Sequence, residues 1–195
     1  MSLQEALQKK KNQLKATKTI VTHADGSKVI EIGNDVKKLE ERSCGFVIDT
    51  KPDVTPACII ENALYLGSQD SVDVNNIDKY NITHVLSVGI ETPNIDQTDL
   101  VCKFIPCLDL PETNLNSVCS EANAFISDAI QNNKIVLVHC NAGVSRSAAI
   151  VIAFLMMHQN LNFNDAYGLV KSKRECIQPN IGFVQQLKML QSNVS

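Results

Sequence analysis

The residues best suited to chemistry lie in one short segment between two apolar runs. The segment IVLVHCNAGVSRS spans residues 135–147, and AAIVIAFLMM follows it directly. The first run is typical of a buried strand and the second of an apolar helix, so the polar residues between them form a strand-to-helix loop. Cys140 begins this loop and Arg146 ends it, which places a potential nucleophile and a permanent positive charge in the same turn.

Such a loop is suited to binding a phosphoryl group. Its backbone N–H groups can point inward at the N-terminus of the helix, where a partial positive charge favours an anion. The same dipoles and the Arg146 guanidinium stabilise the thiolate form of Cys140, which is a competent nucleophile. The planar fork of Arg146 can bind two oxygens, and Gly143 permits close approach of the backbone. The candidate phosphate-binding residues are Asn141, Ala142, Gly143, Val144, Ser145 and Arg146.

A cysteine taken alone is more often a buried thiol than a nucleophile, but Cys140 stands in a fixed pattern with a histidine before it and Gly143 and Arg146 after it. The sequence HCNAGVSRS resembles the HCxxGxxRS signature of the protein tyrosine phosphatase superfamily, in its dual-specificity branch. Similarity continues in ALYLGS, THVLSV and PNIGFVQQL, so the resemblance covers residues 58–191. It implies the cysteine-phosphatase fold, which is α/β with a central, mostly parallel sheet flanked by helices.

The resemblance also implies supporting roles around the loop. Ser147 would donate a hydrogen bond to the departing Cys140 thiolate, and Asn180 would support the loop from behind. His139 would orient the loop rather than transfer protons. Relatives often carry Arg-Pro where this chain has Arg-Glu at 174–175, from which we expect only a local change in the connection.

The general acid is expected at Asp109. This residue follows the apolar run VCKFIPCL, and relatives carry their acid in the matching loop, with an asparagine five residues on, as Asn114 is here. Aspartate is also a common turn residue. The alternative is therefore that Asp109 only caps a turn and that Glu112 or another group donates the proton.

The mechanism that the resemblance implies has two steps and needs neither a cofactor nor a metal. Cys140 displaces the substrate oxygen in line and forms a phosphocysteine, while Asp109 protonates the leaving oxygen. Water activated by the ionised Asp109 then hydrolyses the thiophosphate. Arg146 and the loop amides stabilise the transition state because they are already oriented towards its oxygens.

The absence of tryptophan from the chain excludes the WPD acid loop of the tyrosine-specific branch. The resemblance therefore implies a shallow pocket for phosphotyrosine, phosphoserine and phosphothreonine in proteins. The 55-residue extension is too short for the rhodanese-like kinase-binding domain of typical MAP kinase phosphatases, so the resemblance implies a small, atypical dual-specificity phosphatase. The loop carries no extra Lys or Arg, unlike phosphoinositide-directed relatives, which disfavours lipid substrates. Members of MAP kinase cascades, including MAP kinases and their upstream kinases, are the leading partners by family association. The alternative is a catalytically weak scaffold that binds phosphoproteins or signalling kinases.

The elements that must position these residues alternate between β and α patterns. Beyond residue 56 we expect strands near 58–66, 82–88, 101–108 and 135–139, and helices at 73–80, 117–131, 145–159, 163–173 and 181–191. Asn162 with Asp165 resembles a capping box for the helix at 163–173.

Residues 1–55 are expected to form an N-terminal extension and linker, and residues 56–195 the catalytic domain. A short helix is predicted at 3–16, a hairpin on both sides of Asp25-Gly26, and a linker over the polar stretch 33–56. The lysine run at 9–11 is expected to be a solvated face, with a docking site as the less favoured alternative.

Composition excludes several classes of function. The net charge is −3, and the acidic excess lies beyond residue 55, so we expect neither nucleic acid nor a membrane surface as a partner. No apolar segment approaches the roughly 18 residues of a membrane span, and the N-terminus has no signal-peptide core. A cytoplasmic and also nuclear location is expected. The seven cysteines include no CxxC pair and the four histidines are scattered, so we expect reduced thiols and no metal site.

Overall fold

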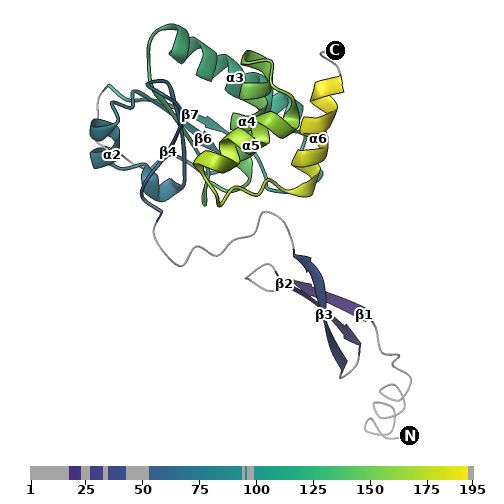
Figure 1. Ribbon diagram of the computed structural model, residues 1–195. Coiled ribbons are helices and arrows are strands. Elements are labelled where there is room, and N and C mark those ends of the chain that lie inside the picture. The colour runs from purple at the N-terminus through teal and green to yellow at the C-terminus, as the bar shows by residue number, and fades with distance from the viewer. Residues whose placement is uncertain are drawn as a thin grey trace, which may run out of the picture. The chain divides into compact units, whose positions relative to one another are not determined.

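The structure is a computed structural model that describes residues 18–22, 27–32, 35–42, 53–93, 95 and 99–192. The chain divides into two compact units, Met1–Phe46 and Val47–Ser195. Figure 1 shows the helices and strands of both units, with labels where there is room. The helix predicted at 3–16 lies outside the described residues.

The first unit contains a three-stranded antiparallel sheet. Strand β1 (Lys18–Thr22) pairs with β2 (Ser27–Ile32), which confirms the predicted hairpin. Strand β3 (Asp35–Arg42) pairs with the other edge of β2, so the prediction of a linker over 33–56 is wrong for these residues. The first four residues of β3 are exposed. The strand is therefore held by main-chain hydrogen bonds to β2, and its charged sequence shows none of the apolar alternation that marks a half-buried strand.

The second unit is built on a five-stranded sheet with the order β4-β5-β8-β6-β7. Four of these strands are parallel, and β4 is antiparallel to β5, which confirms the predicted mostly parallel sheet. The strands are β4 (Ala57–Ile60), β5 (Leu64–Gly67), β6 (His84–Val88), β7 (Val101–Ile105) and β8 (Val136–His139).

The single strand predicted near 58–66 is two strands joined by a turn. The turn covers residues 61–63, and Asn62 has a φ of 55°. This is the left-handed region, which asparagine adopts more readily than most residues. Apolar residues stand on both sides of this turn, so the sequence looks like one continuous run.

Helices cover both faces of the sheet (Figure 1). The short helices η1 (Gln69–Ser71) and α2 (Val74–Lys79) lie over one face, and α3 (Leu115–Gln131), α4 (Arg146–His158), α5 (Phe163–Lys173) and α6 (Ile181–Ser192) lie over the other. The strands alternate between the two cores, so Leu64 and Leu66 pack towards the larger helical layer and Tyr65 packs towards α2. The helices predicted beyond residue 56 are confirmed within two residues at each end. None of the helices in the described part of the chain is long and apolar enough to cross a membrane.

The carboxyl ends of the four parallel strands meet at one edge of the sheet. The register sets Gly67 of β5 and Ser87 of β6 beside His139, the last residue of the central strand β8. Cys140 follows at this edge, and the loop after it runs into α4. Ligands of α/β sheets bind at this edge, outside the carboxyl ends of the strands.

Deleting residues 1–46 is expected to leave the hydrolysis of a small aryl phosphate nearly unchanged, because all the candidate catalytic residues lie in the second, separately compact unit. Steady-state kinetics of the truncated and full-length proteins would check this. Deleting residues 1–55 instead also removes Asp53, which forms an ion pair with Arg174, and is expected to lower activity. If the protein that begins at residue 47 is insoluble or unfolded, the first unit belongs to the catalytic fold.

Candidate active site

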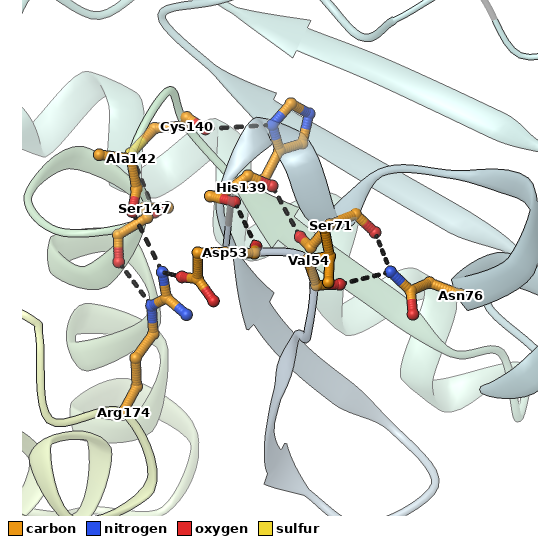
Figure 2. A network of polar contacts seen from close by, with 11 residues as sticks. Asp53, Val54, Ser71, Asn76, His139, Cys140, Ala142, Ser147 and Arg174 are labelled. Atoms are coloured by element: carbon orange, nitrogen blue, oxygen red, sulfur yellow. Dashed lines mark hydrogen bonds and ion pairs between the residues drawn. The ribbon is translucent and has the colours of Figure 1, made fainter. Parts of the chain in front are cut away.

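Arg174 holds two carbonyl groups of the loop between β8 and α4. Its Nε donates a hydrogen bond to Gly143 O at 2.8 Å, and its Nη2 donates one to Ala142 O at 3.1 Å. The same Nη2 pairs with the Asp53 carboxylate, and Figure 2 shows the guanidinium between Asp53 and the loop. The sequence predicts only a local change in the connection at 174–175 and assigns a role to neither Arg174 nor Asp53. One signal could have pointed to Arg174, since relatives often carry an arginine at this position, followed by a proline.

The other loop carbonyls are also turned outward. Gln69 N donates to Asn141 O at 2.9 Å, and Gln178 N donates to Val144 O at 2.8 Å. In a trans peptide the C=O of one residue and the N–H of the next point in opposite directions. The N–H groups of residues 142–145 therefore point into the loop, and none of them donates a hydrogen bond within the described part of the chain.

The N-terminus of α4 opens into the same space. Ser145 is the N-cap residue, yet its side chain makes no capping hydrogen bond. Its hydroxyl instead donates to Asp109 Oδ1 at 2.7 Å and accepts from Asn180 N at 3.0 Å. The first N–H groups of the helix and its positive dipole end are therefore left for an anion.

Cys140 lies beneath the inward N–H groups of the loop, with only 2% of its surface exposed. Ser147 Oγ donates a hydrogen bond to Cys140 Sγ at 3.2 Å, so the structure brings the predicted pair together. Burial raises the pKa of two further thiols, that of Cys107 to about 11 and that of Cys119 to about 12. These two cysteines remain protonated at neutral pH and act as apolar packing groups.

Arg146 lies at the opposite end of the loop. Its Nη1 donates to Gly89 O at 2.9 Å, which fixes the guanidinium against the end of β6. Its Nε is buried and has no hydrogen-bond partner among the described residues, although Asp109 Oδ2 lies 3.7 Å away. An unsatisfied buried donor is costly. An oxyanion in the loop supplies the missing acceptor, so the residues present fit a phosphoryl group.

Asp109 lies at the rim of the loop and is held by two hydrogen bonds. Its Oδ1 accepts from Ser145 Oγ at 2.7 Å and from Asn180 Nδ2 at 2.8 Å. Its Oδ2 is directed towards Arg146. Glu112, the alternative proton donor, is exposed and forms no hydrogen bond or ion pair with the described residues. The geometry therefore favours Asp109 over Glu112 for a reaction in the loop.

His139 is fully buried behind the nucleophile. Its Nε2 lies 2.6 Å from Ser87 Oγ, and its Nδ1 lies 3.3 Å from Cys140 O. Burial lowers the pKa of His139 to about 4, so the ring is neutral at physiological pH. A neutral ring fixed on both sides is suited to orienting the start of the loop and not to accepting protons from a substrate.

Asn180 connects helix α6 to the site. Its Oδ1 accepts from Phe183 N at 2.9 Å and caps the helix, while its Nδ2 holds Asp109. Its own N–H binds the hydroxyl of Ser145. Asn180 therefore supports the loop through Ser145 and also orients the carboxyl of Asp109, which the sequence did not predict.

The chain resembles known proteins along most of its length. The family model for the dual specificity phosphatase catalytic domain matches residues 64–193. The chain is 40% identical over 189 residues to mouse dual specificity protein phosphatase 19. This alignment covers 93% of this chain and 86% of that protein. It is 43% identical to human dual specificity protein phosphatase 9 over 68% of this chain, but over only 35% of that longer protein.

Solved structures show the same fold. Human tyrosine phosphatase-like serine/threonine/tyrosine-interacting protein matches with a TM-score of 0.65 and 32% identity, over 71% of this chain and 97% of that chain. A mouse putative dual specificity phosphatase complexed with zinc tungstate matches with a TM-score of 0.68 and 26% identity, over 76% and 92% of the two chains. The fold is that of an α/β protein phosphatase. The chain belongs to the dual specificity phosphatase family, as a small, atypical member.

Proposed function

We propose that this phosphatase hydrolyses phosphotyrosine, phosphoserine and phosphothreonine in proteins through a phosphocysteine at Cys140. The observation that carries the proposal is the set of inward N–H groups at 142–145 beside the Cys140 thiol and the unsatisfied Nε of Arg146. These donors suit the three equatorial oxygens of a transferring phosphoryl group. The phosphorus would then lie in line between the sulfur and the leaving oxygen.

In the first step the Cys140 thiolate attacks phosphorus, a P–S bond forms and the P–O bond to the substrate breaks. Asp109 gives its proton to the leaving oxygen, and the released group is the free hydroxyl of the substrate. The contacts of Asp109 with Ser145 and Asn180 support this role, because they fix the carboxyl at the mouth of the loop.

In the second step a water oxygen attacks phosphorus while the Asp109 carboxylate takes a proton from it. The P–S bond breaks, phosphate is released and Cys140 leaves as a thiolate. The hydrogen bond from Ser147 supports this step because it stabilises the departing sulfur anion.

We further propose that the substrates are phosphorylated members of MAP kinase cascades, encountered in the cytoplasm and the nucleus. Support for a protein substrate comes from the similarity to dual specificity protein phosphatases and from a loop without Lys or Arg other than Arg146. The zinc tungstate complex of the mouse relative supports oxyanion binding, since tungstate is a tetrahedral oxyanion like phosphate.

Release of inorganic phosphate by the purified full chain would test the proposal. We expect release from phosphotyrosine and phosphothreonine peptides and from a doubly phosphorylated MAP kinase, with little from vesicles that contain phosphatidylinositol phosphates. Faster hydrolysis of the vesicle lipids would overturn the choice of a protein substrate. Binding of the phosphopeptides without any release would instead favour the scaffold. Equal rates on unrelated phosphoproteins and on the kinase would remove the MAP kinase assignment.

A further inference from the structure

Arg174 is a buried cation, with 6% of its surface exposed, at the carboxyl end of α5. Two of its nitrogens hold the Gly143 and Ala142 carbonyls of the loop. A guanidinium buried to this extent requires an anionic partner, because an unpaired buried charge is strongly unfavourable. The partner is Asp53, which forms an ion pair with Arg174 across 121 positions of the sequence.

Asp53 is itself held in place. Its main-chain carbonyl accepts a hydrogen bond from Ser68 Oγ at 2.7 Å, and the next carbonyl, that of Val54, accepts one from Asn76 Nδ2 at 2.6 Å. Figure 2 shows this strip of contacts running from Asn76 through Val54 and Asp53 to Arg174. The carboxylate is therefore presented to Arg174 by a segment fixed at two consecutive carbonyls.

The part of the loop that Arg174 holds is its most adaptable point. Gly143 has a φ of 65°, and an added Cβ would lie 2.5 Å from Gly67 O and 2.6 Å from Arg174 Nη2. A glycine moves between backbone conformations at little steric cost. If the guanidinium turned away, the peptide units on either side of Gly143 could rotate and direct a carbonyl oxygen into the loop. That oxygen would repel the phosphoryl group instead of binding it.

We propose that Asp53 is a positioning residue of the phosphatase, which acts through Arg174 to keep the loop carbonyls outward and the N–H groups inward. The proposal depends on the proposed function, since it assumes that the loop binds phosphoryl oxygens. Asp53 precedes both the expected domain start at 56 and the region 64–193 that matches the family model. The catalytic unit therefore begins before residue 53.

The test uses Asp53→Asn in the full chain, because asparagine keeps the shape of the side chain and loses its charge. We expect the affinity for tungstate, measured by calorimetry, and kcat/KM for an aryl phosphate to fall about tenfold. Asp53→Glu, which keeps the charge, is expected to retain most of both. The matched control is Asp70→Asn, which removes the same charge from an exposed position and should leave both values unchanged.

Whether Asp53 acts on the loop through Arg174 is tested by combining variants of the two residues. Arg174→Lys keeps the charge but loses the planar fork by which two nitrogens hold both carbonyls and Asp53. It is expected to lose as much tungstate affinity as Asp53→Asn, while the double variant should lose no more than either single variant. Wild-type affinity in folded Asp53→Asn, or a further tenfold loss in the double variant, would overturn the proposal. If Asp53→Asn does not fold, wild-type tungstate affinity in Arg174→Lys would overturn it. Failure of the wild-type chain to bind tungstate or to hydrolyse the aryl phosphate would count against the proposed function itself.

Discussion

Cys140→Ser is expected to abolish turnover while phosphate binding is preserved. A serine hydroxyl is a far weaker nucleophile than a thiolate and is a poor leaving group in the second step, so the loss should exceed about 10⁴-fold. The loop carbonyls and the Arg146 guanidinium are held by groups that this change does not touch. Single-turnover hydrolysis of a phosphotyrosine peptide and calorimetric titration with tungstate would measure both effects.

The control for this variant is Cys102→Ser, which makes the same replacement at an exposed position on β7 and should retain full activity. Appreciable turnover by Cys140→Ser would contradict the covalent mechanism. Loss of tungstate binding in the same variant would show instead that the sulfur contributes to holding the anion.

Asp109→Asn is expected to reduce turnover in proportion to the basicity of the leaving oxygen. Asparagine keeps an oxygen that can accept from Ser145 and Asn180, as Asp109 does, but it has no carboxyl proton to give. An alkoxide, or a phenoxide whose phenol has a pKa of about 10, needs that proton, and withholding it should cost roughly 10² to 10⁴ in rate. An aryl phosphate with a weakly basic phenolate should lose far less.

Single-turnover rates for a phosphothreonine peptide and for aryl phosphates of graded phenol basicity would measure this dependence. Glu112→Gln is the matched control, because it removes a carboxylate from the same loop and should leave the series unchanged. Equal losses across the series for Asp109→Asn would mean that Asp109 is structural. A graded loss in Glu112→Gln would transfer the acid role to Glu112.

The loop between β8 and α4 is predictable because the sequence signals that define it are local. The strand, the turn and the helix around Cys140 are contiguous in sequence, and the apolar runs on both sides fix where the chain enters and leaves the sheet edge. The assignment of Asp109 needed the resemblance as well, since a single aspartate after a strand is not distinctive. The cap of α5 is also predictable from local spacing, because Asn162 Oδ1 accepts a hydrogen bond from Asp165 N at 3.0 Å.

The remaining features depend on contacts that no local pattern records. Asp53 and Arg174 meet across most of the chain, and neither apolar periodicity nor spacing links them. Asn62 interrupts an apolar run at a turn that only its backbone conformation reveals. Strand β3 is charged and is held by main-chain hydrogen bonds to β2, so its sequence resembles that of a linker. In each case contacts with other parts of the fold determine the local structure, which the residue propensities of the segment alone do not.

The uncapped start of α4 links catalysis to stability. A side-chain cap at Ser145 would contribute about 1 kcal/mol to the folded protein, and the chain forgoes this contribution by turning the hydroxyl towards Asp109 and Asn180. Phosphate bound as proposed would take the place of the cap, and by mass action the native state would gain a free energy of RT ln(1 + L/Kd), where L is the phosphate concentration. The empty enzyme would thus be the less stable form, and each proposed catalytic cycle would pass through a ligand-stabilised native state before product leaves.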